Sequence, residues 1–397
     1  MPHSLPAVVC VGYNRPDALR RLLACVENAA YPAGADVSLI VSIDKSPNQA
    51  EVRAAAEAVP WTHGTRTFRC FPERQGLRSH ILQCGDLSAD YGAVVVLEDD
   101  LLVAPDYYGY LLQALGRYPD DPRLAGFALY SHAWNGYADV PFQPAHSGAD
   151  AYFGQYSITW GQCWTARQWQ AFRAWYAAHP ALDPADTRMP ADIPRWPDTS
   201  WGKYFVFYIL DTDRYYLVPY VSLSTNCEEA GQHNFGGDDS HQVPMREGTG
   251  MAYRFCDFCD AVRYDIFFER MNLKLPARLS IDMRDVCVDL SGGHRDAMGR
   301  RYLLTMRTFD LPCVASFGLR LRPVEANVSL DMPGDVIRLY DVNGAPLCER
   351  PDRAQTFLRM RYDLYRFGWR RLLAYALGDM ARRIRGRMMR LFCRKAR

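Results

Sequence analysis

The sequence predicts an α/β protein built on a doubly wound, parallel sheet. In its first hundred residues, apolar segments of strand length alternate with segments whose apolar residues recur at helical spacing, an order typical of right-handed βαβ units. After about residue 275, short strand-like segments are separated by turns, and the chain ends in a basic amphipathic pattern. We therefore expect an α/β domain over 1–270, a β-rich unit over 275–350 and a helical tail over 355–397.

The elements of the α/β domain can be assigned in order. The apolar segment 7–12 predicts the first strand, and the turn after it places Pro16 and Asp17 in the first turn of a helix, where both residue types are favoured. A second strand over 37–43 ends at Asp44. The elements expected next are a helix at 50–59, a strand at 65–70, a helix at 77–91 and a strand at 94–97.

The last of these strands ends in three consecutive carboxylates, Glu98, Asp99 and Asp100. Adjacent carboxylates repel one another and bury badly, so a divalent cation or a polar ligand is expected to neutralise them. Arg15 and Asp44 follow the first two strands and would lie at the same carboxyl edge, where open α/β sheets bind ligands. Arginine complements phosphate and carboxylate binds a ribose or a metal, so the pattern predicts a nucleotide pocket. The alternative is a solvated acidic turn.

Composition excludes several other classes of protein. The formal net charge of +1 conceals a tail over 361–397 with 12 Lys and Arg against 2 acids, so the remainder sums to about −9. A basic patch without a recognition fold does not predict nucleic-acid binding. No apolar run reaches the eighteen or so residues of a membrane span, no secretory leader pattern is present, and the 12 cysteines are scattered, so a cytoplasmic location is expected.

Two common nucleotide-binding loops and a zinc site are disfavoured. The first strand is followed by neither Gly-x-Gly-x-x-Gly nor Gly-Lys-Ser/Thr, which argues against a Rossmann dehydrogenase, a P-loop enzyme and a nucleotidyltransferase. Cys256 and Cys259 have zinc-ribbon spacing, but no second pair at matching spacing completes four ligands.

Several motifs in this order resemble a known family. The N-terminal two-thirds is similar to GT-A glycosyltransferases, close to bacterial family 2-like enzymes that share features with the N-acetylglucosaminyltransferase I type. The resemblance rests on the opening loop, the second strand end, the acidic motif with its Ala-Pro-Asp-Tyr-Tyr continuation, the Trp-Gly-x-x-Trp segment and a closing Asn with Gly-x-His. These segments are 12–16, 42–44, 96–108, 156–164 and 219–233.

The resemblance implies a Rossmann-like, doubly wound mixed sheet, a nucleotide-sugar donor that is most often a UDP-sugar, and Mn2+ or Mg2+ as cofactor. It makes Asp100 the direct metal ligand, Asp99 a ribose or metal-supporting partner and Glu98 a residue that orients the loop. His233 becomes a phosphate contact or a metal ligand, with a generic surface histidine as the alternative. The other residues that it places around the donor are Gly12, Tyr13, Asn14, Arg15, Asp44, Arg78, Trp160 and Gly161.

Tryptophans in the Trp-Gly segment have a physical rationale, because an indole packs on the apolar face of a sugar ring. For Trp160, Trp164 and Trp169 the alternative is a position in the hydrophobic core.

The catalytic base is harder to assign. An inverting transfer needs a carboxylate within hydrogen-bond reach of the acceptor hydroxyl. Relatives carry an Asp after a Trp at the start of a helix, but here Gly202 follows Trp201. Asp198 could serve instead, or could only cap the helix predicted at 201–210. Glu229, with Glu228 beside it, is the reserve candidate.

The C-terminal part supplies two further expectations. Strands are predicted at 279–282, 286–290, 302–306 and 336–340, and the unit that they form could handle the acceptor, support the catalytic domain or mediate self-association. In the tail, apolar residues recur every three or four positions among arginines, which predicts an amphipathic helix that lies on an anionic membrane. A solvated helix is the alternative. The apolar residues are Leu373, Leu377, Met380, Ile384, Met388 and Leu391.

These observations together predict a metal-dependent, inverting glycosyltransferase. It would transfer a sugar from a nucleotide sugar to a glycan or a lipid-linked saccharide in bacterial surface polysaccharide synthesis, in the cytoplasm and peripheral to the inner membrane. The alternative is a catalytically impaired nucleotide-sugar-binding or scaffold subunit, which Gly202 supports.

Overall fold

The computed structural model describes residues 5–119, 121–227, 241–364 and 368–395. The chain divides into two compact units. The larger comprises residues 1–306 and 311–347, and the smaller comprises 307–310 and 348–397.

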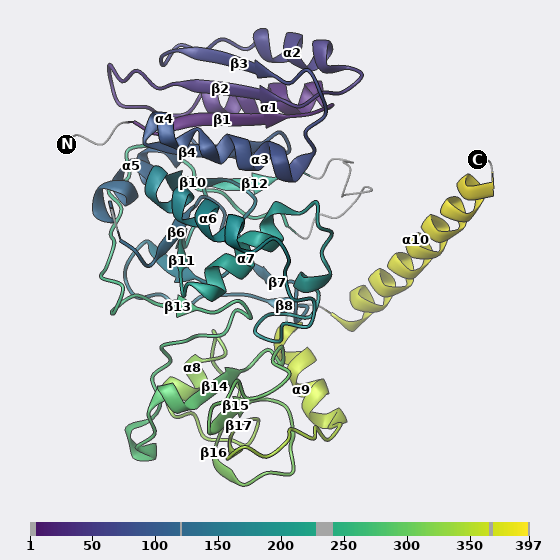
Figure 1. The fold of residues 1–397 in the computed structure, drawn as a ribbon. Helices are drawn as coiled ribbons and strands as arrows, with labels where there is room; N and C mark the ends of the chain where they lie inside the picture. The colour runs from purple at the N-terminus through teal and green to yellow at the C-terminus, as the bar shows by residue number, and fades with distance from the viewer. Residues whose placement is uncertain (1–4, 120, 228–240, 365–367, 396–397) are drawn as a thin grey trace. The chain divides into compact units, whose positions relative to one another are not determined.

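A nine-stranded mixed sheet organises the larger unit, and the protein is therefore of the α/β class. Its strand order is β13-β9-β11-β6-β10-β4-β1-β2-β3, and Figure 1 shows this sheet running through the middle of the unit. The first four strands in the chain are mutually parallel, as predicted. Their bounds are β1 Ala7–Gly12, β2 Leu39–Ile43, β3 Arg66–Cys70 and β4 Ala93–Glu98.

Antiparallel strands make the second half of the sheet mixed. Strand β10 lies between β4 and β6 and is antiparallel to both, and β9 is antiparallel to β11. A parallel sheet alone, as the alternating pattern predicted, therefore describes only the first half. The bounds are β6 Leu124–Ala128, β9 Ala151–Gly154, β10 Gln162–Thr165, β11 Tyr215–Pro219 and β13 Arg263–Tyr264.

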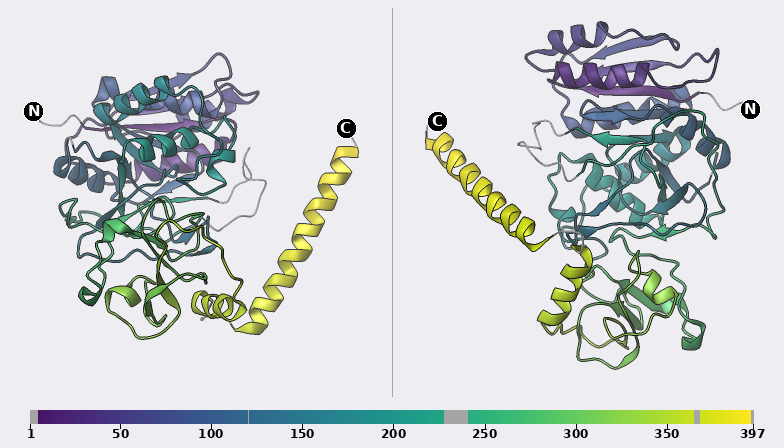
Figure 2. Two further views of the ribbon diagram at one scale, coloured as in Figure 1. Left: turned by 60° about the horizontal axis from the view of Figure 1, so that its bottom comes forward. Right: turned by 180° about the vertical axis from the view of Figure 1, so that it is seen from behind.

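Helices cover both faces of the sheet because successive strand residues point to opposite sides. Val95 and Leu97 of β4 belong to the core shared with α1 and α5, whereas Val94 and Val96 pack with α3, α6 and α7. Figure 1 shows the second group in front of the sheet, and the rear view in Figure 2 shows α1 on the other face. Bounds are α1 Pro16–Glu27, α2 Gln49–Glu57, α3 Leu77–Asp86, α4 Ser88–Tyr91, α5 Tyr107–Arg117, α6 Ala166–Ala178 and α7 Trp201–Asp211.

The expected helix at 77–91 is two helices, because α3 ends and α4 begins around Leu87. The expected second strand starts at Leu39, two residues late. Short strand pairs complete the domain. Strand β5 (Leu101–Val103) pairs with β12 (Ser224–Asn226), and β7 (Trp134–Asn135) pairs with β8 (Val140–Pro141).

A smaller four-stranded sheet follows in the order β14-β15-β17-β16. Strands β14 (Val286–Asp289), β15 (Tyr302–Thr305) and β17 (Ile337–Asp341) lie where they were predicted. The strand expected at 279–282 is wrong: two 3-10 turns occupy Ala277–Leu279 and Met283–Asp285, and the Asp282 side chain caps the second. Strand β16 (Cys313–Phe317) was not predicted, and its first two residues are exposed. Helix α8 (Ala326–Ser329) packs Val328 into the core of this sheet.

A buried polar network joins the turn after β13 to the small sheet. The carboxylate of Asp265 accepts hydrogen bonds from the backbone N–H groups of Phe267 and Glu269, each at 2.9 Å. His294 lies with Nε2 3.7 Å from Asp265 and Nδ1 3.3 Å from Asp289 of β14. Glu269 accepts a 2.6 Å bond from the Ser291 backbone N–H. Fully satisfied networks of this kind fix a unique arrangement.

Burial dominates the electrostatics of this network. It raises the pKa of Asp265 to about 6 and, with repulsion from Asp289 and Asp265, raises the pKa of Glu269 to about 7. Between pH 4.5 and 7 the folded protein therefore keeps a proton on Glu269 that the unfolded chain has lost. Folding stability must decrease as the pH rises through that window.

Replacing Glu269 by Gln should remove this loss of stability. The wild type should lose roughly 3 kcal/mol of its free energy of unfolding between pH 5 and pH 8, and Glu269→Gln should not show this loss. Gln keeps the Oε1 acceptor and cannot ionise. Denaturant unfolding at both pH values measures the difference. Glu57→Gln, whose side chain is 47% exposed on α2, is the matched control with no expected pH dependence. Parallel wild-type and Glu269→Gln profiles would contradict the assignment.

The smaller unit is helical. It contains α9 (Arg353–Asp363), with the Asp352 side chain as N-cap, and the 27-residue α10 (Trp369–Lys395). Among the described residues, no helix is both long and apolar enough to cross a membrane.

Candidate active site

The acidic turn after β4 meets the loop after β1. Val11 of β1 is in parallel register with Glu98 of β4, so the residues that follow the two strands leave the sheet side by side. Arg15 Nη2 forms an ion pair with Asp99 Oδ1 and lies 3.1 Å from Asp100 Oδ2. Burial opposes the charge on Arg15, but the two carboxylates outweigh it and raise the pKa of the guanidinium. The structure thus brings together three residues predicted from sequence.

The three acids of the turn differ in environment. Asp99 is buried, with 7% of its side chain exposed, whereas 27% of the Asp100 side chain is exposed beside Arg15. Burial, followed by repulsion from Asp100 and Asp99, raises the pKa of Glu98 to about 8. Asp100 is therefore more accessible to a ligand than Asp99.

Asp44 lies at the end of β2, the strand next to β1, and its carboxylate organises the loop before α3. It accepts hydrogen bonds from the backbone N–H groups of Gln75 at 2.8 Å and Gly76 at 3.0 Å. Arg74 Nε lies 3.3 Å from its Oδ2. With 3% of the Asp44 side chain exposed, a contact to a base or a ribose would use a carboxylate that already holds this loop.

Tyr13 extends the same assembly. The guanidinium of Arg74 stacks on the Tyr13 ring, 3.5 Å from its centroid, so Arg74 bridges the opening loop and Asp44. The neighbouring Asn14 is exposed, and its carbonyl accepts a 3.0 Å bond from Asn48. A Cβ on Gly12 would lie 2.8 Å from a Leu19 methyl carbon, so a larger residue there would require the Leu19 side chain to move. Sequence analysis missed Arg74, although its place between β3 and α3 was a signal.

The end of β12 reaches the acidic turn from the other side. Asn226 pairs with Leu101 of β5, and the backbone N–H of Cys227 donates a 2.7 Å bond to the carbonyl of Asp100. The chain therefore enters the segment 228–240 at the acidic turn. The predicted site residues Glu229 and His233, with Glu228, lie outside the described residues.

The Trp-Gly segment contributes one accessible indole. Trp164 and Trp169 are buried in the core with 0% and 2% exposure, so the core alternative is correct for both. Trp160 is only partly buried and packs on Tyr130 and His241, with ring centroids 4.7 Å away in each case. Gly161 adopts a φ of +94°, which favours glycine.

Sequence analysis also missed His132, Tyr130 and His241. Tyr130 and His132 follow β6, and His241 resumes the described chain after the gap at 228–240. The His132 ring lies 5.7 Å from Trp160, and burial lowers the pKa of this histidine to about 3, so it is neutral.

The candidate base Asp198 lies three residues before the start of helix α7. Asp198 is exposed over 83% of its side chain and pairs with Lys203 Nζ at 3.1 Å. The helix is capped by Ser200, whose Oγ accepts from the Lys203 N–H, so the capping role considered for Asp198 is wrong. Arg78 of α3 donates a 2.8 Å bond to the Tyr204 hydroxyl, which ties a predicted donor contact to this helix.

Gly202 points toward the Trp-Gly segment. A Cβ there would lie 3.3 Å from the Thr159 methyl and 3.7 Å from the Ser157 hydroxyl. A side chain at position 202 would therefore face the residues directly before Trp160. The departure from Asp at this position removes a carboxylate that would point there.

The acidic turn has the donor chemistry for a hard divalent cation. Within the described ranges no group of three or more His, Cys, Asp or Glu is arranged to hold a metal. Mg2+ sites, however, commonly use only one or two protein carboxylates together with substrate phosphates and water, and Asp100 offers such a carboxylate. The residues present fit a cation that is completed by a diphosphate.

Comparison with known proteins leaves the family open. No protein-family profile and no curated protein matches the sequence. Among solved structures, TarS of S. aureus matches with a TM-score of 0.35 and 9% identity over 57% of this chain and 37% of TarS. The mannosyltransferase PcManGT from Pyrobaculum calidifontis, in complex with GDP-Man and Mn2+, matches with a TM-score of 0.33 and 16% identity. That match covers 55% of this chain and 58% of PcManGT, and likenesses this weak carry no functional conclusion.

Removing the positive charge of Arg15 from the acidic turn should destabilise the fold. Arg15→Gln leaves Asp99 buried beside two further acids without their shared partner, so the free energy of unfolding should fall by roughly 2–3 kcal/mol. Denaturant unfolding at pH 7 measures the loss.

Arg20→Gln is the matched control, because Arg20 pairs with the exposed Asp17 on the same helix. Its free energy of unfolding should change by less than about 0.5 kcal/mol. Equal stabilities for the two variants would show that the acidic turn does not depend on Arg15.

Proposed function

We propose that this protein is a metal-dependent, inverting GT-A glycosyltransferase, related to the bacterial family 2-like enzymes. It would transfer a hexosyl or N-acetylhexosaminyl group from a UDP-sugar to a glycan or a lipid-linked saccharide of a bacterial surface polysaccharide. The observation that carries the proposal is the meeting of Arg15, Asp99 and Asp100 at the carboxyl edge of the sheet, with Asp44 at the next strand end.

Each site residue would have its own role, including His233, which lies outside the described residues. A bound divalent cation, held by Asp100 and by His233 of the segment 228–240, would neutralise charge on the departing diphosphate. Asp99 keeps Arg15 in place beside that position, where a guanidinium can bind phosphate oxygens. Arg74 contacts both Tyr13 and Asp44, and these residues would lie beside the nucleotide. The half-buried Trp160 offers an indole face for a sugar ring.

The chemical step needs a base for the acceptor hydroxyl. In direct displacement the acceptor oxygen forms a bond to the anomeric carbon while the bond to the diphosphate breaks, and a carboxylate takes the hydroxyl proton. Asp198 is accessible and is oriented by Lys203, and Glu229 is the reserve base.

The second candidate function is a nucleotide-sugar-binding or scaffold subunit without turnover. Gly202 favours it, because the position that faces the Trp-Gly segment carries no carboxylate. Binding of the donor without transfer or hydrolysis would establish this alternative.

Activity measurements separate the two functions. With Mn2+ and a panel of UDP-, GDP- and dTDP-sugars, Asp100→Asn should lower donor turnover by roughly 100-fold or more, because it removes the metal carboxylate. Asp198→Asn should also lower turnover by roughly 100-fold if it is the base, while donor affinity stays within about twofold.

Asp192→Asn, which alters an exposed aspartate in the same loop, is the matched control and should retain full activity. If the Asp198→Asn variant keeps full activity, Glu229 becomes the candidate base. Wild-type protein without turnover on any donor contradicts the enzyme and favours the binding subunit.

We further propose that helix α10 places the protein on the cytoplasmic face of the inner membrane, near a lipid-linked acceptor. Six large apolar side chains of this helix are at least half exposed, and the helix also carries Arg370, Arg371, Arg382, Arg383 and Arg385. The six apolar residues are Trp369, Leu373, Tyr375, Leu377, Met380 and Ile384. Amphipathic helices with this composition lie in the interface of anionic membranes, and each cation adds on the order of 1 kcal/mol.

Vesicle sedimentation tests this placement. The protein should bind vesicles that contain phosphatidylserine and should bind pure phosphatidylcholine much more weakly. Leu373→Glu with Leu377→Glu should reduce the binding about tenfold or more, because both side chains lose apolar burial. Leu330→Glu, at another side chain that is 66% exposed, is the control. Equal binding by both proteins would leave α10 as a solvated helix.

A further inference from the structure

Helix α9 exposes a cluster of large apolar side chains. Phe357 is 64% exposed, Met360 is 54% exposed and Leu358 is 39% exposed. Residues three or four positions apart lie on one face of a helix, so Phe357 and Met360 are neighbours on the face that we call the outer face of α9 (353, 357, 358, 360 and 361). Large apolar side chains that cluster at a surface mark an interaction site, whereas single ones do not.

The opposite face of the same helix is polar and largely covered. Gln355 is buried. Arg359 and Asp363 pair at 2.6 Å, and only 19% and 11% of their side chains are exposed. A helix on the surface of a water-soluble domain has the reverse pattern, with apolar residues inside and polar residues outside. The reversal in α9 indicates that its outer face is suited to an apolar environment and not to water.

Two arginines flank the apolar cluster. Arg353 and Arg361 lie four residues before and four residues after Phe357, on the same face, and both are exposed. The only acid in the sequence of α9 is Asp363, which is paired with Arg359 on the opposite face. The outer face therefore combines apolar side chains with positive charge. An arginine can lay its carbon chain along an apolar surface and extend its charge toward phosphate groups.

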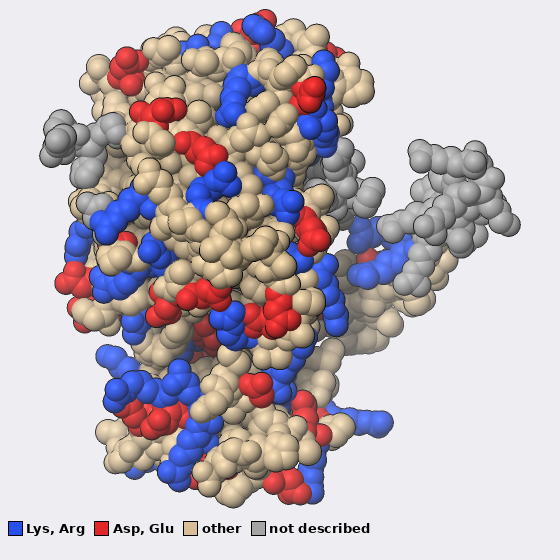
Figure 3. All heavy atoms as spheres, viewed as in Figure 1, with Lys and Arg blue, Asp and Glu red and all other residues tan. Residues whose placement is uncertain are grey.

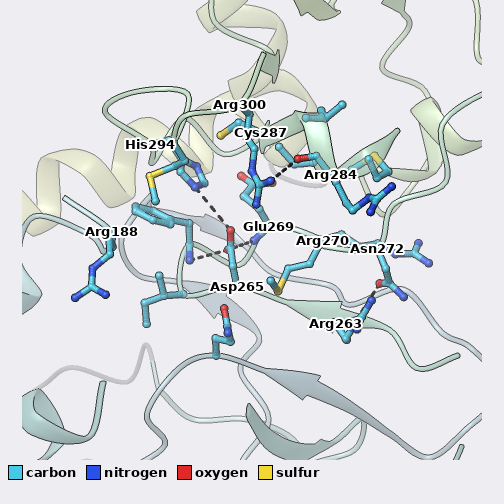
Figure 4. Close-up of a pocket in the computed structure, with 18 of the residues that line it drawn as sticks. Arg188, Arg263, Asp265, Glu269, Arg270, Asn272, Arg284, Cys287, His294 and Arg300 are labelled. Carbon is cyan, nitrogen blue, oxygen red and sulfur yellow. Dashed lines mark hydrogen bonds and ion pairs between the residues drawn. The ribbon is translucent and has the colours of Figure 1, made fainter. Parts of the chain in front are cut away.

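Other surfaces are of a different kind. On the face shown in Figure 3, basic and acidic side chains are interspersed. The cavity drawn in Figure 4, with a volume of about 590 Å³, is lined by basic and acidic side chains together. Its Asp265 and Glu269 already accept hydrogen bonds from backbone N–H groups of the protein. Mixed charge of this kind suits contact with water, so α9 is the stronger candidate for contact with a large apolar partner.

We propose that the outer face of α9 binds the interface of an anionic membrane, as a second lipid contact in addition to α10. Its three apolar side chains would enter the boundary of the acyl chains, while Arg353 and Arg361 contact lipid phosphates. The inference rests on the membrane placement proposed above for α10 and extends it to the preceding helix. A second copy of the chain suits this face less well, because a twofold contact joins the same patch from both copies and sets arginine against arginine.

Vesicle sedimentation of the full-length protein, with equal amounts of phosphatidylserine and phosphatidylcholine, tests the contact. Phe357→Gln with Met360→Gln removes apolar surface at constant net charge, and glutamine is a good helix former. The fold should therefore be retained, and binding should fall by about tenfold or more. Leu330→Gln with Val314→Gln is the matched control, at residues outside both helices that are 66% and 44% exposed, and should bind as the wild type does.

A charge variant supplies a second measurement. Arg353→Gln with Arg361→Gln should lower the affinity for the same vesicles by about tenfold or more. The dependence of binding on salt should also become weaker, because fewer cations face the lipid.

The outcomes separate this inference from the proposals on which it rests. If the wild type does not sediment with the vesicles, the contacts by α10 and α9 both fail, whereas turnover of a soluble donor still tests the transferase. If Leu373→Glu with Leu377→Glu lowers binding while either α9 variant binds like the wild type, only the α9 contact is overturned. A wild-type dimer that becomes monomeric on Phe357→Gln with Met360→Gln, measured by sedimentation equilibrium without lipid, would replace the membrane by a second copy.

Discussion

The constraint on which the candidate site depends is charge compensation at the end of a buried strand. Strand β4 is apolar and central, and the chain leaves it through three acids, of which Asp99 is buried and Asp100 is partly exposed. Arg15, 84 residues away from Asp99, supplies the cation because the parallel register of β1 and β4 brings the two loops together. Without it, three carboxylates would share one turn, a costly arrangement inside a protein.

The neighbouring strand ends extend this arrangement into a site. Asp44 fixes the loop before α3 through backbone N–H groups, and Arg74 connects that loop to Tyr13. On the other side, β12 pairs with β5 and directs the chain past Asp100. Preorganised polar groups at a sheet edge are what a charged ligand requires, since no reorganisation opposes binding. The edge therefore combines one accessible carboxylate with a rigid frame of paired charges.

The small sheet belongs to the same compact unit as the α/β domain, and buried titratable groups connect the two. Asp265 and Glu269 lie on the turn after β13, whereas His294 and Asp289 belong to the loop and strand of the small sheet. Because the carboxyl groups are protonated more readily in the folded protein, this connection is strongest at mildly acidic pH.

The sequence by itself determined that β1 to β4 run parallel, that an acidic turn follows β4 and that Arg15 follows the first strand, because hydrophobic periodicity and strand-end chemistry are local properties. It did not determine the antiparallel strand β10, since a short strand pairs according to its distant neighbours. Only the tertiary structure decided that Trp164 and Trp169 are core residues while Trp160 is accessible, that Ser200 and not Asp198 caps α7, and that Arg74 joins Asp44 to Tyr13. Those outcomes depend on contacts between residues far apart in the chain, which composition and spacing do not encode.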